Sequence, residues 1–126
     1  MDKDILAFTT AVGAKVPEIE NFKLMFKRSN YFTFNGKFLV VKISRSKRPF
    51  WGVGKDFIDF LNGLHAFYLV LLTSEREGWV FSKAEINRNI GSGRWGLGQD
   101  GQYKINWPLP DANAFHSRET FKAKLP

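Results

Sequence analysis

The segment Arg45-Ser-Lys-Arg-Pro-Phe-Trp51 combines three cations with two aromatic rings. Lysine and arginine neutralise phosphates, and aromatic rings stack on exposed bases, so this composition suits contact with a nucleic acid. The alternative is that Phe50 and Trp51 fill the core beneath a helix while the charges are merely solvated. For the two rings we favour the core, and for the cations we favour phosphate binding.

This segment lies in a long window without acids. The chain has no Asp or Glu between Glu20 and Asp56, yet the window holds nine of the 19 Lys and Arg, and the net charge is +7. Such a run of like charges repels itself, and a polyanion relieves the repulsion while releasing its own counterions. We therefore expect nucleic acid, in the first place DNA, as the partner, bound by a single face that gathers these cations. The nine are Lys23, Lys27, Arg28, Lys37, Lys42, Arg45, Lys47, Arg48 and Lys55.

Two cations outside the Arg45–Trp51 segment are candidates for different reasons. Lys42 alternates with Val41 and Ile43 along an expected strand, where it is either a phosphate ligand or part of the solvent face. Arg94 lies in Gly91-Ser-Gly-Arg-Trp-Gly96, which matches G-x-G-x-x-G but follows a helix instead of a strand, so we reject a dinucleotide site. The full set of candidate nucleic-acid contacts is Lys42, Arg45, Lys47, Arg48, Trp51, Lys55 and Arg94.

Other reactive residue types give little sign of catalysis. The chain has no cysteine, which excludes a disulfide framework, a thiolate zinc site and a cysteine nucleophile. His65 and His116 lack neighbouring acids in a ligand pattern, and we take both as incidental. The pairs Asp56/Asp59 and Glu75/Glu77 fit a helix start and a charged turn, respectively. We predict no metal ligand and no cofactor from these patterns.

The elements that must position these residues follow from periodicity and turn residues. We expect one domain over residues 1–126, beginning with a helix from Asp2 that Gly13 ends. Alternation then predicts three antiparallel strands over residues 22–26, 31–34 and 38–43. Asn35-Gly36 supplies the type I′ turn between the second and third strands.

The second half of the chain alternates loops, helices and strands. Residues 45–54 contain Pro49 and two glycines and are expected to form a loop, followed by a helix over residues 55–63. The apolar run over residues 66–73 predicts a central strand covered on both faces. Ser82 and Glu85 form a capping box that starts a helix ending at Gly91. Residues 94–97 and 102–107 then predict a hairpin, residues 108–115 a loop, and the remaining end is expected to fray.

The chain shows no signal for a membrane. Its longest apolar run, Ala66 to Leu72, is far shorter than the roughly 20 residues that a spanning helix needs. The first residues, MDKDILAF, lack a basic start followed by an apolar run, and the basic window contains no amphipathic helix. We expect a soluble, cytoplasmic protein.

The α-β-β-β-α-β order, with Asn35-Gly36 leading into Lys37-Phe-Leu-Val-Val-Lys-Ile-Ser44 and a basic loop behind it, resembles the restriction-endonuclease-like superfamily, the PD-(D/E)XK nucleases. The layout is most similar to small Holliday-junction resolvases and extends over about residues 2–90. The order of the expected elements predicts an α/β (mixed α+β) class, with a mixed sheet flanked by helices, plus a C-terminal helix and hairpin. The resemblance implies carboxylates that hold Mg²⁺, a lysine that positions the attacking water, and a homodimer.

The acids of that motif are missing here. The resemblance places the Asp that opens the second strand near Ser29-Asn30, and the third-strand motif on residues 40–42 or 42–44, where no carboxylate occurs. Only Lys42 remains, and Glu20 is the other candidate for a catalytic role. We therefore expect a nucleic-acid-binding protein with a degenerate nuclease-like site. Two alternatives stay open: a Mg²⁺-dependent DNA endonuclease with migrated carboxylates such as Glu18, Glu20 or Asp56, and an inhibitor-like module that binds an acidic protein.

Overall fold

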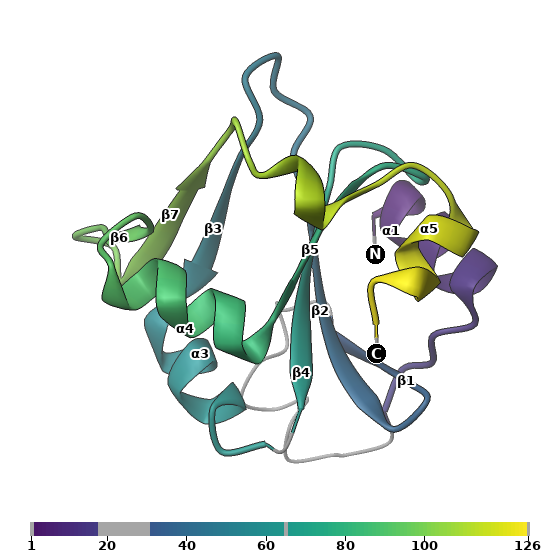
Figure 1. The fold of residues 1–126 in the computed structure, drawn as a ribbon, viewed down its shortest axis with the longest axis horizontal. Helices are drawn as coiled ribbons and strands as arrows, with labels where there is room; N and C mark the ends of the chain where they lie inside the picture. The colour runs from purple at the N-terminus through teal and green to yellow at the C-terminus, as the bar shows by residue number, and fades with distance from the viewer. Residues whose placement is uncertain (1, 18–30, 65, 126) are drawn as a thin grey trace.

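The computed structural model describes residues 2–17, 31–64 and 66–125 (Figure 1). These residues form four α-helices, one short 3₁₀ helix and two sheets, which is a mixed α+β architecture. The predicted strand over residues 22–26 lies outside the described residues. The elements are α1 (Lys3–Val12), β1 (Tyr31–Phe34), β2 (Lys37–Ile43), β3 (Phe50–Gly54), α3 (Lys55–Leu61), β4 (Phe67–Leu72), β5 (Gly78–Ser82), α4 (Lys83–Gly91), β6 (Gly96–Leu97), β7 (Gln102–Asn106), η1 (Asp111–Asn113), β8 (Ala114–Phe115) and α5 (Arg118–Ala123).

The larger sheet has the order β1-β2-β4-β5-β8. β1 and β2 form the predicted hairpin, because Asn35 and Gly36 take the positive φ values, 49° and 74°, that a type I′ turn requires. β4 is fully buried and pairs parallel to β2, so the predicted central strand is confirmed. β5 and β8 then continue the sheet in antiparallel pairing.

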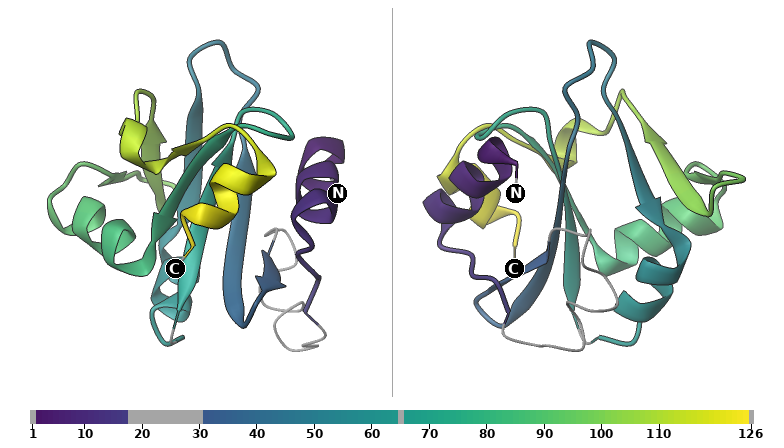
Figure 2. Two further views of the ribbon diagram at one scale, coloured as in Figure 1. Left: turned by 45° about the vertical axis from the view of Figure 1, so that its right-hand side comes forward. Right: turned by 180° about the vertical axis from the view of Figure 1, so that it is seen from behind.

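This sheet separates two cores. Alternate side chains of β2 and β4 point to opposite faces, as a pleated strand requires. One face packs against α1 and α5, whereas the other packs against α3, α4 and the smaller sheet (Figures 1 and 2). Val40 and Leu69 belong to the second core, and their neighbours Val41 and Val70 belong to the first.

The smaller sheet corrects the prediction that residues 45–54 form a loop throughout. β3 pairs antiparallel with β7, and β6 pairs with the other side of β7. Pro49 precedes the strand and therefore removes no ladder hydrogen bond, and the side chain of Gln102 covers Gly52 so closely that a Cβ there would lie 2.3 Å from its Oε1. A strand with two glycines is possible here because its partner's side chain fills the space.

The end of the described chain is also more ordered than expected. α5 begins with a capping box between Ser117 and Thr120, and Phe121 on that helix is fully buried. The Phe121 ring packs on the rings of Phe8 and Phe115, with centroids 5.0 and 5.1 Å away. The expected fraying of this end is therefore wrong for residues up to 125. No helix among the described residues has the length and apolar character needed to span a membrane.

Candidate nucleic-acid interface

The basic loop, residues 44–49, connects β2 of the larger sheet to β3 of the smaller one. It stands out from the body of the protein at the top of Figure 1. Ser44 fixes its base, because its backbone N–H donates to the Leu72 carbonyl at 3.0 Å and its Oγ accepts from the Phe50 N–H at 3.2 Å. The N–H of Trp107 donates to the Pro49 carbonyl at 3.0 Å. The loop is thus anchored at both ends to neighbouring strands.

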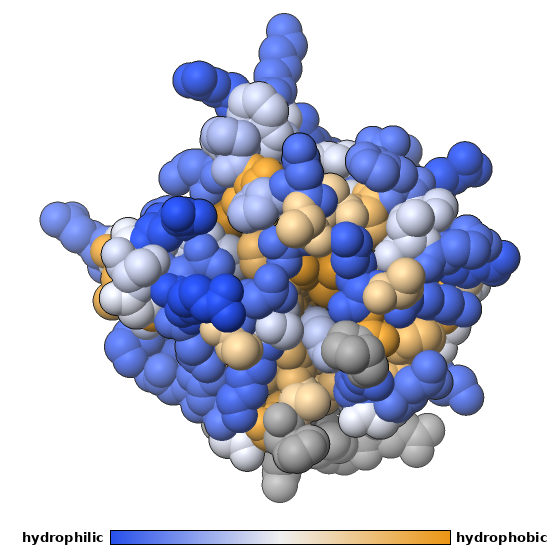
Figure 3. All heavy atoms as spheres, in the orientation of Figure 1, coloured by the Kyte–Doolittle hydropathy of each residue, from blue (hydrophilic) through white to orange (hydrophobic). Residues whose placement is uncertain are grey.

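Lys47 and Arg48 occupy the exposed part of this loop. Among the residues that the structure describes, no ion pair and no side-chain hydrogen bond is formed by either one. Hydrophilic side chains extend beyond the outline of the molecule at this end (Figure 3). Two cations without internal counter-charges are therefore available to a ligand in solution.

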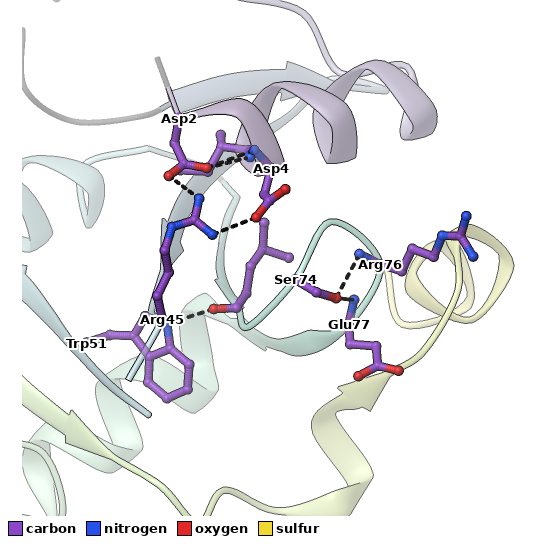
Figure 4. A network of polar contacts seen from close by, with 9 residues as sticks. Asp2, Asp4, Arg45, Trp51, Ser74, Arg76 and Glu77 are labelled. Atoms are coloured by element: carbon purple, nitrogen blue, oxygen red, sulfur yellow. Dashed lines mark hydrogen bonds and ion pairs between the residues drawn. The ribbon is translucent and has the colours of Figure 1, made fainter. Parts of the chain in front are cut away.

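Arg45 is different, because its guanidinium group forms ion pairs with two acids (Figure 4). Nη1 lies 2.6 Å from Oδ2 of Asp4, and Nη2 pairs with Oδ2 of Asp2. The hydrogen bonds that Arg45 donates to Asp4 and Asp2 raise the pKa of Arg45, and the one to Asp2 is the main cause of a lowered pKa for that acid. Arg45 therefore fastens the base of the loop to α1, and it is not a free phosphate ligand.

The two aromatic rings of the segment have opposite environments. Trp51 is 3% exposed, and its Nε1 donates to the Leu72 carbonyl at 3.1 Å, so the favoured core placement holds for this ring. Trp51 is thus not at a surface where a base can stack. Phe50, its neighbour on the other face of β3, is 56% exposed, so the core placement that we favoured is wrong for this ring.

Trp107 is a candidate that the sequence analysis missed. Its side chain is 49% exposed, and its backbone pairs with Pro49, so it lies beside the end of the basic loop. The sequence places this residue only at the end of the predicted hairpin, over residues 102–107. The pairing of that hairpin with β3 has no local signature.

Lys42 lies on the face of β2 that is turned toward the smaller sheet, together with Val40. It lines a hollow of about 310 Å³ with Ser44, Arg45 and Trp51. Burial lowers the pKa of Lys42 below its ordinary value. Of the two alternatives for Lys42, the fully solvated strand face is wrong, and the role of phosphate ligand remains a prediction.

The expectation of one face that gathers the cations of the window is wrong for the described residues. Lys37 begins β2 and Arg45 follows its end, so this seven-residue strand separates them by about 20 Å. Lys55 lies at the end of β3 remote from the loop, and its Nζ pairs with Asp59 at 2.6 Å, which raises its pKa. Arg94 is exposed but belongs to the turn after α4.

The described residues offer no place for the Mg²⁺ that the resemblance implies. Residues 2–17, 31–64 and 66–125 contain no group of three His, Cys, Asp or Glu suited to a metal ion. The hollow beside Lys42 has no carboxylate in its described lining, whereas Mg²⁺ requires oxygen ligands. Glu18, Glu20 and the Ser29-Asn30 positions lie outside the described residues, and Asp56 is at the first turn of α3.

Comparisons with known proteins identify no relative of the chain. No family model, no curated protein and no solved structure gives a significant match.

Proposed function

We propose that the protein binds nucleic acid through the basic loop, with Lys47 and Arg48 on phosphates and Phe50 stacked on a base. The observation that carries this proposal is the position of two cations, which have no ion pair within the described residues, beside an exposed ring on a loop that is fixed at its base. Phosphate contacts supply affinity, and an aromatic face adds a contact that tolerates any base. Single-stranded segments suit this arrangement best, because their bases are accessible.

The structure reduces the number of phosphates that the loop is expected to neutralise. Arg45 and Lys55 are engaged by acids, and Lys37 lies at the other end of β2. Two or three cations therefore remain for phosphate contacts, namely Lys47, Arg48 and, in the hollow beside the base of the loop, Lys42. For a single strand, about three phosphates give a slope of log affinity against log salt of roughly −2. Binding is therefore weak and strongly reduced by salt.

The test uses fluorescence polarisation with labelled single-stranded, duplex and four-way-junction DNA, and single-stranded RNA, at several salt concentrations. The double variant Lys47→Glu/Arg48→Glu should bind at least tenfold more weakly, and its salt slope should be smaller by roughly 1.4. The control is Lys15→Glu/Lys122→Glu, which changes the net charge by the same amount. Lys15 follows α1 and Lys122 lies on α5, both at exposed positions on the side of the larger sheet that these two helices cover. Equal losses in both double variants would mean that only net charge matters, and no binding at low salt would end the proposal.

Phe50 supplies a second, independent variant. Phe50→Ala removes an exposed ring, so it should leave the fold intact while weakening binding to single strands about tenfold, the lower range for loss of one stacked base. Duplex binding should change much less, because paired bases present no free face. An equal effect on both forms of DNA would argue against stacking by this ring.

A further inference from the structure

A second cationic site lies away from the basic loop. A hollow of about 240 Å³ opens between α4, the turn that follows it, and the segment around η1. Arg88 of α4 and Arg94 of the turn both line it, together with Asn89, Ser92 and Asn113. Figures 1 and 3 show this part of the molecule from the same direction, with α4 and η1 toward the viewer and with mainly hydrophilic atoms over α4.

The acid of this hollow is already engaged. Oε1 of Glu85 accepts the N–H of Ser82 at 2.9 Å, and Oε2 accepts Nδ2 of Asn113 at 2.8 Å. Burial alone would raise the pKa of Glu85, but these hydrogen bonds outweigh it and lower the pKa, so Glu85 is a charged cap of α4. Within the described residues, neither Arg88 nor Arg94 forms an ion pair or a side-chain hydrogen bond. Two guanidinium groups thus line the hollow without a direct ion pair among the described residues, and the charge of Arg88 also helps to lower the pKa of Glu85.

The glycine-containing turn holds Arg94 in this place. The carbonyl of Asn89 accepts both the Ser92 hydroxyl, at 3.2 Å, and the Trp95 N–H, at 3.1 Å. Gly93 between them has a φ of +79°, a conformation that other residues rarely adopt. The Trp95 ring is buried edge-on against Phe81, with centroids 5.0 Å apart. The backbone before and after Arg94 is therefore held in place.

We propose that this hollow binds the phosphoryl group of a phosphate monoester, with Arg88 and Arg94 as its ligands. A monoester carries nearly two negative charges and three acceptor oxygens, and guanidinium groups match such oxygens through paired N–H donors. The Ser92 hydroxyl and the side-chain amides of Asn89 and Asn113 also line the hollow, but each already donates a hydrogen bond within the protein, so the proposal rests on the two guanidinium groups. Phe81 adds an apolar wall for the organic part of the ligand. The site is independent of the basic loop, since none of its residues belongs to residues 44–50.

The first test is an NMR titration of the ¹⁵N-labelled protein with inorganic phosphate and with ribose 5-phosphate. We expect saturable shifts of the amides of residues 88–95, and a tighter interaction with the ester. Arg94→Gln and Arg88→Gln should each weaken both interactions at least tenfold. Arg76→Gln is the matched control, because Arg76 is 79% exposed in the β4–β5 turn and lines a different hollow. Wild-type affinity in Arg94→Gln, or equal losses in Arg76→Gln, would overturn the site.

Gly93→Ala tests the same site without removing a charge. A Cβ at Gly93 would meet no neighbouring atom within 4 Å, so the strain comes from the positive φ and acts on the backbone beside Arg94. The variant should retain the fold and lose affinity for ribose 5-phosphate. Unchanged affinity, with a spectrum showing that the turn has shifted, would contradict the role of the turn.

The ester can be a free small molecule or the terminal phosphate of a strand, and a third measurement separates these sources. Oligonucleotides with a 5′-phosphate or a 5′-hydroxyl are compared in the Lys47→Glu/Arg48→Glu background, where the basic loop is disabled. A 5′-phosphate advantage that disappears with Arg94→Gln indicates a strand end, whereas ribose 5-phosphate binding without that advantage indicates a small ester. Absence of binding by every phosphate probe overturns the site, whatever the outcome for the basic loop.

Discussion

Nη1 of Arg45 lies 2.6 Å from Oδ2 of Asp4, which joins the base of the basic loop to the first turn of α1. Asp2 takes part in the same cluster and also caps the helix, since its Oδ1 accepts the Asp4 N–H at 2.8 Å. One arginine of the acid-free window thus has a structural partner more than forty residues earlier in the chain. The free cations of the loop are consequently fewer than its sequence suggests.

Substitutions of Asp2 should separate its two roles. Asp2→Ala removes the cap and should lower the free energy of unfolding by about 1 kcal/mol. Asp2→Asn keeps a capping oxygen but loses the charge opposite Arg45, so its loss should be smaller. Urea unfolding of both variants at pH 7 checks this order. Equal losses in the two variants would mean that the ion pair, which both variants lose, dominates over the cap.

Lys42→Met should stabilise the protein at neutral pH. Burial lowers the pKa of Lys42, so the charged form is disfavoured in the folded state, and this cost is present below the folded pKa. The cost disappears as the pH rises through the folded pKa to the unfolded value of about 10.4. A gain of about 0.5 kcal/mol corresponds to a Tm increase of roughly 1–4 °C at pH 7.

The Lys42→Met advantage should shrink when thermal unfolding is repeated near pH 10.5. An advantage that stays constant with pH would show that packing, not charge, causes it. Lys37→Met, at the start of the same strand, is the matched control.

Glu85→Gln should make the stability less dependent on acid pH. The pKa of Glu85 is lowered in the folded protein, so its contribution is complete above the unfolded pKa of about 4.3 and is lost as the pH falls through the folded pKa. The variant should therefore be less stable at pH 7, by about 1 kcal/mol, and approach the wild type below pH 3. Unfolding curves between pH 2 and 7 measure this difference. Parallel curves for the two proteins would exclude Glu85 as a source of acid sensitivity.

Phe121→Ala should be strongly destabilising. The ring is fully buried between α1 and β8, and loss of a buried phenylalanine typically costs about 3–5 kcal/mol. Leu6→Ala, at a position that is 53% exposed on α1, should cost far less and serves as the control. If the two variants unfolded at the same denaturant concentration, α5 would contribute nothing to the core.

The elements that the sequence predicts correctly carry local signals. Asn35-Gly36 fits only a tight hairpin, the apolar run of β4 needs two covered faces, and Ser82 with Glu85 caps a helix through its nearest neighbours. The strand β3 lacks such a signal. It depends on β7, which lies about fifty residues later and covers Gly52 with the side chain of Gln102.

The candidate site likewise has some features that the sequence predicts and others that depend on tertiary packing. The sequence places cations and rings in one segment, but only tertiary packing turns Trp51 inward and leaves Phe50 exposed. The partners of Arg45 come from α1, and no spacing rule predicts them. A count of charges along the chain also does not show that Lys37 and Arg45 lie at opposite ends of β2.

The order of the strands has a consequence for any attempt to cut the protein into parts. The chain leaves the larger sheet after β2, returns with β4, leaves again for β6 and β7, and returns with β8. Each sheet is therefore assembled from segments that alternate along the sequence, and no contiguous fragment contains all strands of one sheet without strands of the other. Protease nicking at any one connection should release no autonomous piece, and both sheets should melt as one unit.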